Sequence, residues 1–162
     1  MKEECILQVP FCKFIFHIMG RVQLELPDQF IFSTVLEVRG ADLNYGGHVG
    51  NDRILGLMQE ARIRFYRSVG FKDELHFDGS VGHVIADAVV IYKSESFLGD
   101  QLEIQIGISG ITRYAFDMYY LIINQNSKKE IARGKTGMVC FDYDKRKVAP
   151  IPEVLLKNLK GD

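Results

Sequence analysis

The chain contains 162 residues and has a mass of 18.5 kDa, which is the size of one ordinary domain. Hydrophobic residues make up 47% and charged residues 25%, so the composition excludes an intrinsically disordered chain. The 20 basic and 21 acidic side chains give a formal charge of −1, without the positive excess that drives nonspecific nucleic-acid binding. The cysteines Cys5, Cys12 and Cys140 are odd in number and far apart, which argues against a disulfide framework or zinc site and fits a reducing cytoplasm.

The N-terminal stretch differs in character from the rest of the chain. It is apolar but is interrupted by Pro10, Lys13 and His17, so it falls short of the roughly 20 apolar residues that a membrane span needs. It also makes a poor signal peptide, because no small-residue cleavage site follows it. We therefore expect residues 1–18 to be a dispensable extension and residues 19–162 to form one domain. An added strand or a contact with a neighbouring molecule remains an open alternative for the extension.

The first predicted elements are a strand, a loop and a helix. Apolar and polar side chains alternate over residues 30–38, which is strand periodicity. A glycine-rich loop covers residues 41–52, and an amphipathic helix is predicted over residues 52–69. Asn51 or Asp52 is a suitable N-cap. The apolar stripe of this helix consists of Ile54, Leu57, Met58, Ala61, Phe65 and Val69.

The second half of the chain predicts four strands with short connections. They cover residues 81–94, 101–112, 113–124 and 131–143, and a short helix is predicted near the C-terminus. Consecutive strands with short loops pair antiparallel, and one helix with one apolar face must lie on the sheet they form. The pattern predicts an α+β domain with five or six strands. Because one helix covers only part of such a sheet, we expect at least a homodimer, and pairing of dimers into a homotetramer stays open.

The loop before the helix carries a recognisable motif. Residues 42–51 read DLNYGGHVGN, and Glu60 lies 12 positions past His48. This pattern resembles the acyl-CoA and acyl-ACP thioesterases of the hotdog fold, whose signature is D-x-D-x-x-G-H-V-N-N followed by an acidic residue at about that spacing. The resemblance covers about residues 27–156 and includes later matches at residues 98–100 and 132–137. It implies a hotdog fold, in which an antiparallel sheet of five or six strands wraps around one long central helix.

The resemblance also implies which residues bind the substrate. Asn51 lies where the family presents a backbone N–H to the thioester carbonyl, and the unpaired N–H groups of a helix N-terminus suit a developing oxyanion. Gly47, Val49 and Gly50 belong to the same substrate-binding loop, although simple turn glycines are an alternative. Gly56 costs about 1 kcal/mol relative to alanine inside a helix, and we expect it to open space for the substrate beside Glu60.

The acid–base group of the site departs from the family signature. The second Asp of that signature falls on Asn44, and an amide cannot act as a nucleophile or general base at neutral pH. Within the expected catalytic set of Glu60, His48 and Asn44, the acid–base work therefore moves to Glu60, His48 or both. The alternatives are an i,i+4 salt bridge between Glu60 and Arg64 and a purely structural role for His48.

These features predict a thioesterase that hydrolyses a fatty or aromatic acyl-CoA or acyl-ACP to the free acid and thiol. Fatty acid metabolism in the cytoplasm is the expected setting, with no cofactor, no metal, no nucleic-acid partner and no membrane association. Because Asn44 departs from the signature, a non-catalytic protein that binds acyl thioesters or acts as a scaffold is the main alternative. A hydratase of the same fold is a third hypothesis, but the acid–histidine pair that it needs is not found in the expected context.

Overall fold

The computed structural model describes residues 22–160 and contains two helices longer than one turn, one 3-10 turn and six strands. Strand β1 (Phe32–Glu37) is followed by the 3-10 turn η1 (Gly40–Asp42) and by helix α2 (Asn51–Ser68). The remaining elements, in order, are β2 (Val81–Tyr92), β3 (Gln101–Ser109), β4 (Ala115–Asn124), β5 (Glu130–Asp142), β6 (Lys147–Val148) and α3 (Glu153–Lys160). The element order is the one predicted, apart from the two-residue strand β6 and the 3-10 turn.

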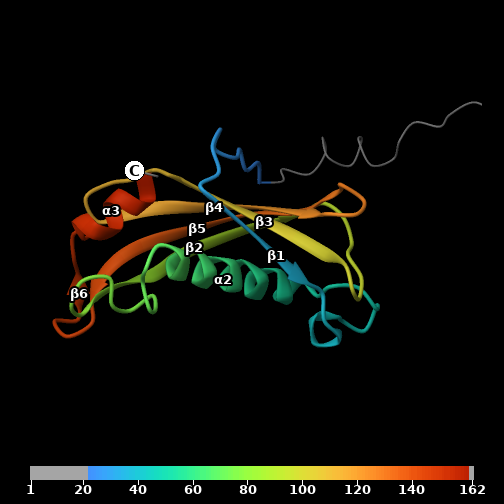
Figure 1. The fold of residues 1–162 in the computed structure, drawn as a ribbon, viewed down its shortest axis with the longest axis horizontal. Helices are drawn as coiled ribbons and strands as arrows, with labels where there is room; N and C mark the ends of the chain where they lie inside the picture. Colours follow the sequence, from blue (N-terminus) through green and yellow to red (C-terminus); the bar gives the residue numbers. More distant parts are fainter. Residues whose placement is uncertain (1–21, 161–162) are drawn as a thin grey trace, which may run out of the picture.

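All strand pairs in the sheet are antiparallel, and the main strand order is β1-β3-β4-β5-β2. The short strand β6 pairs with β5. The sheet curves along its length, and α2 runs beneath it along one face (Figure 1). This arrangement confirms the predicted α+β fold of the hotdog type, in which a curved sheet wraps around an 18-residue helix.

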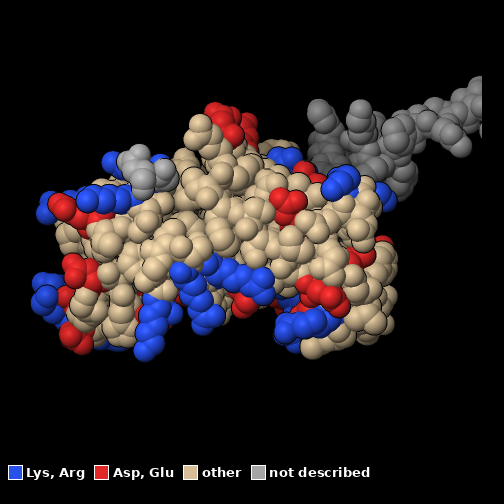
Figure 2. All heavy atoms as spheres, viewed as in Figure 1, with Lys and Arg blue, Asp and Glu red and all other residues tan. Residues whose placement is uncertain are grey.

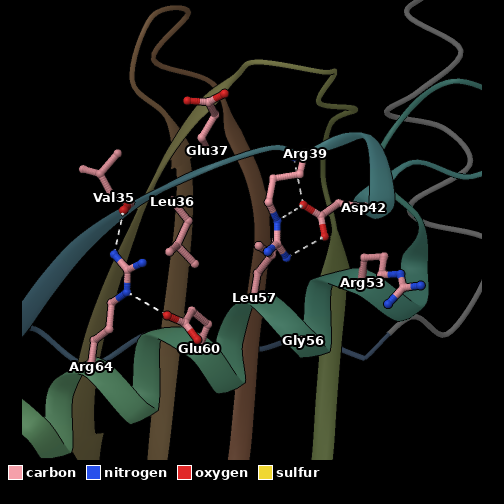
Figure 3. Close-up of a pocket in the computed structure, with 10 residues that line it drawn as sticks. All are labelled: Val35, Leu36, Glu37, Arg39, Asp42, Arg53, Gly56, Leu57, Glu60 and Arg64. Carbon is pink, nitrogen blue, oxygen red and sulfur yellow. Dashed lines mark hydrogen bonds and ion pairs between the residues drawn. The ribbon is translucent and has the colours of Figure 1, made fainter.

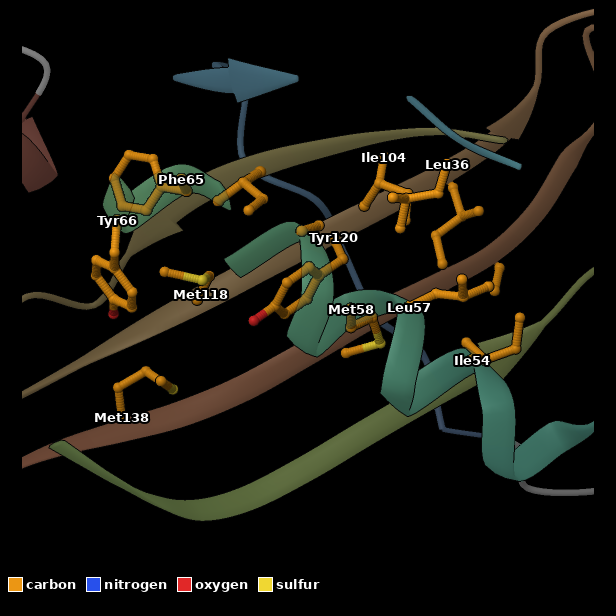
Figure 4. Packing of buried hydrophobic residues seen from close by; sticks show 14 of the residues in the cluster. Leu36, Ile54, Leu57, Met58, Phe65, Tyr66, Ile104, Met118, Tyr120 and Met138 are labelled. Carbon is orange, nitrogen blue, oxygen red and sulfur yellow. The ribbon is translucent and has the colours of Figure 1, made fainter. Parts of the chain in front are cut away.

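The core fills the space between α2 and the sheet. Residues Phe116, Met118, Tyr120 and Ile122 are buried on β4, where burial alternates with a period of two. The helix contributes the predicted stripe, and Figure 4 shows Ile54, Leu57, Met58, Phe65 and Tyr66 directed at the strands. The close packing of α2 favours a glycine on β5, because a Cβ at Gly134 would lie 2.5 Å from the terminal carbon of Met58, which would have to move.

The boundaries of α2 differ slightly from those predicted. Neither Asn51 nor Asp52 is the N-cap, because the helix already begins at Asn51 and the extended residue before it, Gly50, takes the cap position. A Cβ at Gly50 would lie 2.5 Å from the Asp52 carboxylate, which folds back over the helix start. At the other end Gly70 has a φ of 92°, the left-handed conformation that commonly ends a helix and favours glycine.

The face of the sheet away from α2 is covered in part by residues 22–31 and by α3 (Figure 1). Pro27 lies against Gly107, where a Cβ would be 2.6 Å from its ring, and the backbone N–H of Ile31 donates to Ile106. Leu155 and Leu159 of α3 are buried. The predicted extension, residues 1–18, lies outside the described residues. Among residues 22–160, no helix has the length and hydrophobicity required to span a bilayer.

Charged side chains are unevenly distributed over the surface. Figure 2 shows a broad central area without Lys, Arg, Asp or Glu, while Lys and Arg side chains gather along the side where α2 lies. Arg53, Arg64 and Arg67 are exposed on that helix. The basic side chains therefore follow the exposed face of α2, opposite its buried stripe.

Candidate active site

The motif loop is tied together at its two ends by Asp42. Its carboxylate accepts hydrogen bonds from the backbone N–H of Arg39 at 2.9 Å and from the guanidinium group of the same residue. Its backbone carbonyl accepts the N–H of Gly50 at 2.9 Å, just before α2 begins. Burial alone raises the pKa of Asp42, but the hydrogen bonds and charge of Arg39 outweigh it, so the pKa lies below its ordinary value. Asp42 therefore stabilises the loop as a carboxylate.

Asn44 and His48 face each other across this loop. The Nδ2 atom of Asn44 lies 3.1 Å from Nε2 of His48, and the backbone N–H of Asn44 donates to the carbonyl of His48 at 2.9 Å. The loop can close this tightly because residue 46 is a glycine: a Cβ there would lie 2.9 Å from Cε1 and 3.1 Å from Nδ1 of the imidazole. Gly47 has a φ of 76°, a conformation that side chains disfavour. Glycines at these two positions thus permit the loop conformation in which His48 faces Asn44.

His48 lines a groove of about 320 Å³ at the N-terminus of α2. Within the described chain, the backbone N–H of Asn51 donates to no acceptor, as the geometry of a first-turn N–H predicts. The hydroxyl of Tyr92, at the end of β2, donates to the Asn51 carbonyl at 3.0 Å and holds the helix start against the sheet. Val49 and Ile54 supply apolar surface to the same groove. The structure thus brings four of the predicted residues together: Asn44, His48, Val49 and Asn51.

Glu95 is a groove residue that the sequence analysis missed. It follows β2, and its Oε1 atom lies 3.5 Å from Nδ1 of His48. The backbone carbonyl of the next residue, Ser96, accepts a hydrogen bond from the backbone N–H of Val49 at 2.9 Å. This bond attaches the segment to the motif loop. Glu95 is 47 positions from His48 and belongs to no local motif. Its position depends on where β2 ends in the sheet, so the sequence carried no signal for it.

Glu60 and Gly56 lie apart from this groove. They line a second groove of about 530 Å³ between α2 and β1, together with Arg64 and Val35 (Figure 3). Arg64 donates from Nε to Glu60 at 2.9 Å and from Nη1 to the carbonyl of Val35 at 3.1 Å. Glu60 lies nine positions after Asn51 on the helix, a rise of about 13 Å. Within one chain, the structure does not bring Glu60 to His48, and the i,i+4 ion pair with Arg64 is formed.

The first groove combines the parts that an acyl-transfer site requires. It has a free N–H at a helix N-terminus for a developing oxyanion, a histidine, a carboxylate and apolar walls. Within residues 22–160, no group of three or more His, Cys, Asp or Glu side chains is arranged to hold a metal ion.

Comparison with known proteins assigns most of the chain to one protein family. Residues 38–159 match the family model of the thioesterase-like superfamily. The 1,4-dihydroxy-2-naphthoyl-CoA hydrolase of Synechococcus elongatus is 26% identical over 120 residues, which cover 73% of this chain and 87% of that protein.

Two solved structures share the fold over most of the chain. The 1,4-dihydroxy-2-naphthoyl-CoA thioesterase from Synechocystis superposes with a TM-score of 0.73 at 23% identity, covering 80% of this chain and 95% of that one. A thioesterase from Thermus thermophilus, solved in complex with coenzyme A and Zn, has a TM-score of 0.70 at 26% identity, covering 83% and 95%. With the family match spanning three quarters of its length, this chain belongs to the thioesterase-like superfamily.

Proposed function

We propose that this protein is a thioesterase that hydrolyses an acyl-CoA to the free acid and coenzyme A. The observation that carries the proposal is the free N–H of Asn51, which lies in the same groove as His48. A helix N-terminus concentrates positive partial charge, and its first N–H groups lack intrahelical acceptors. Such a donor stabilises the negative charge that develops on a thioester oxygen when water attacks the carbonyl carbon.

Coenzyme A and an aromatic acyl group are the proposed parts of the substrate. Support for the carrier comes from the Thermus thermophilus thioesterase, which was solved with coenzyme A bound. Support for the acyl group comes from the two cyanobacterial proteins, both named for 1,4-dihydroxy-2-naphthoyl-CoA. A groove of about 320 Å³ lies at the lower end of the range for small-molecule sites and suits a ring system better than a long fatty chain.

The proposed active form is at least a homodimer, formed along β2. This strand is at the end of the sheet order, and Val84, Ile85 and Tyr92 on it are exposed apolar side chains. Two copies related by a twofold axis would pair their β2 strands antiparallel and cover this edge. The groove at Tyr92 would then lie beside the partner subunit. A monomeric mass in light scattering at micromolar concentration, with activity intact, would contradict this proposal.

Glu60 stays a predicted catalytic carboxylate. In a dimer, the groove that contains Glu60 and Gly56 in one subunit could complete the groove that contains His48 in the other. If Glu60 is the general base, Glu60→Gln lowers kcat by about 10²- to 10⁴-fold with little change in KM. Retention of the wild-type rate would leave the ion pair with Arg64 as the role of this residue.

A backbone substitution tests the proposed oxyanion site directly. Proline is well tolerated at the first position of a helix, and Gly50 has a ψ of 145°, which suits a residue before proline. Asn51→Pro therefore removes the N–H while keeping the helix. The matched variant Asn51→Ala loses the same side chain but keeps the N–H. We expect the proline variant to be about 10²- to 10³-fold slower in kcat than the alanine variant, with similar melting temperatures.

The substrate panel for this assay contains benzoyl-, hexanoyl- and palmitoyl-CoA and an acyl-ACP, with thiol release as the readout. Equal rates for the two Asn51 variants would contradict the oxyanion role. The alternative function, binding without hydrolysis, is favoured by one observation: both polar atoms of the Asn44 side chain are engaged within the loop. Binding of benzoyl-CoA in calorimetry without thiol release from any thioester would establish that alternative.

A further inference from the structure

The direction of the hydrogen bonds around His48 follows from the backbone. The N–H of Gly46 donates to Oδ1 of Asn44 at 2.8 Å, which fixes the orientation of the side-chain amide. The Nδ2 atom of Asn44, which can only donate, therefore faces Nε2 of His48 at 3.1 Å. Nε2 must accept this bond. The proton of the neutral imidazole is consequently on Nδ1.

The protonated Nδ1 atom of His48 faces Glu95. The two atoms Nδ1 and Oε1 are 3.5 Å apart, so Nδ1 is the imidazole atom that lies next to the carboxylate. The hydrogen bonds thus run from Gly46 through Asn44 to His48, and Glu95 lies next to the far side of the imidazole. Glu95 lines the groove that contains the Asn51 N–H, and its side chain is 65% exposed, so water reaches its free oxygen.

We infer that Glu95 is the general base of the proposed thioester hydrolysis and that His48 positions it. The inference rests on the proposed function. His48 is poorly placed to take a proton, because the amide of Asn44 occupies the lone pair of Nε2 and Nδ1 already carries a proton. Glu60, the other candidate, lines the second groove and is engaged in an ion pair with Arg64 at 2.9 Å.

The reaction step balances with water as the second reactant. The Glu95 carboxylate takes a proton from water while the water oxygen bonds to the thioester carbonyl carbon, and the Asn51 N–H meets the resulting oxyanion. The carbon–sulfur bond then breaks, and Glu95 returns the proton to the leaving thiolate. The products are the carboxylic acid and the thiol, and no oxidant, reductant or cofactor takes part.

The inference predicts a specific kinetic pattern for substitutions of Glu95. Glu95→Gln should lower kcat for benzoyl-CoA by about 10²- to 10⁴-fold with KM nearly unchanged, because a general base acts in the transition state. Glu95→Asp should recover part of this loss. Glu153→Gln, an exposed carboxylate on α3, is the matched control and should keep the wild-type rate. Melting temperatures should stay equal, since the substituted side chains are exposed.

A double variant separates the positioning role of His48 from an independent one. If His48 acts through Glu95, His48→Ala combined with Glu95→Gln should be no slower than Glu95→Gln alone. If the two substitutions lower kcat by factors that multiply in the double variant, His48 does not act through Glu95. If Glu95→Gln keeps the wild-type rate, Glu95 is not the general base, whatever rate Glu60→Gln shows. If the wild-type protein releases no thiol from any thioester in the panel, the proposed function itself fails and the inference fails with it.

Discussion

The two ends of α2 each place a histidine near a glutamate, but in opposite surroundings. At the N-terminal end, His48 and Glu95 are 3.5 Å apart, with side chains 33% and 65% exposed. At the C-terminal end, His83 and Glu74 are 3.9 Å apart, with side chains 2% and 22% exposed. The same two residue types are therefore open to water at one end of the helix and removed from it at the other.

The buried end is organised around Arg62, which is 3% exposed. Its guanidinium group donates to Glu74 and lies 3.4 Å from the hydroxyl of Tyr120. Burial disfavours its charge, but these partners outweigh burial and hold its pKa above the ordinary value. Burial and the nearby Arg62 charge lower the pKa of His83 to about 3, so it stays neutral next to the rings of Tyr66 and Phe77.

The comparison shows that burial decides what such a pair can do. An exposed carboxylate beside an exposed imidazole is open to water. A histidine that stays neutral down to about pH 3 cannot take part in acid–base chemistry near pH 7, and its neighbours stabilise the fold instead. Four substitutions test this difference, from the largest expected effect to the smallest.

Arg62→Met should destabilise the protein most. Removing one partner of a buried ion pair leaves the other charge without compensation and typically costs about 3–5 kcal/mol. Urea denaturation at pH 7 measures the loss. Arg67→Met, an exposed position on the same helix, should change stability by less than about 0.5 kcal/mol. Equal effects of the two variants would show that the buried pair contributes no more than surface charge.

Gly46→Ala should lower the activity of the groove at the N-terminal end of α2 without unfolding the protein. The new Cβ would lie 2.9 Å from Cε1 of His48, so the imidazole must move away from its place between Asn44 and Glu95. A displacement of this kind can cost about 10²-fold in kcat. Gly40→Ala, where a Cβ meets no atom within 4 Å, is the control. A wild-type kcat for Gly46→Ala would show that the position of His48 is unimportant.

His83→Phe should change how stability depends on pH. The folded pKa of about 3 lies below the ordinary value of 6.5, so only the unfolded chain gains this proton as the pH falls through 6.5. Wild-type stability should therefore fall by about 1.4 kcal/mol per pH unit below that value, or about 2 kcal/mol by pH 5, from this group alone. Phenylalanine cannot be protonated. Between pH 7.5 and 5 the wild-type protein should therefore lose about 2 kcal/mol more stability than the variant in urea denaturation, and parallel curves would contradict the assignment.

Gly56→Ala should have the smallest effect on stability, a gain of up to about 1 kcal/mol. A Cβ at this exposed helical position meets no atom within 4 Å, and alanine is the better helix former. If the second groove admits substrate or a partner subunit, kcat/KM should fall several-fold despite the gain. Unchanged kcat/KM would remove Gly56 from the predicted substrate-binding residues.

Sequence patterns predicted most of the fold. The helix stripe from Ile54 to Phe65 is buried as expected, and the strand predicted over residues 113–124 is formed by β4, because local periodicity follows directly from helix and strand geometry. The loop motif also predicted that His48 and Asn51 lie together, since they are neighbours in the sequence. Its resemblance to a known signature led to the family that the comparisons support.

Tertiary structure decided the features that depend on distant segments. Arg62 carries a charge that normally favours the surface, and it is buried because Glu74 and Tyr120 reach it from segments 12 and 58 positions away. Glu95 meets His48 because the sheet order brings the end of β2 to the helix N-terminus. Glu60 faces β1 and Arg64 instead of His48 because about 13 Å of helix separates it from that end. Periodicity along the chain determines which face a residue occupies, whereas the pairing of strands determines which faces meet.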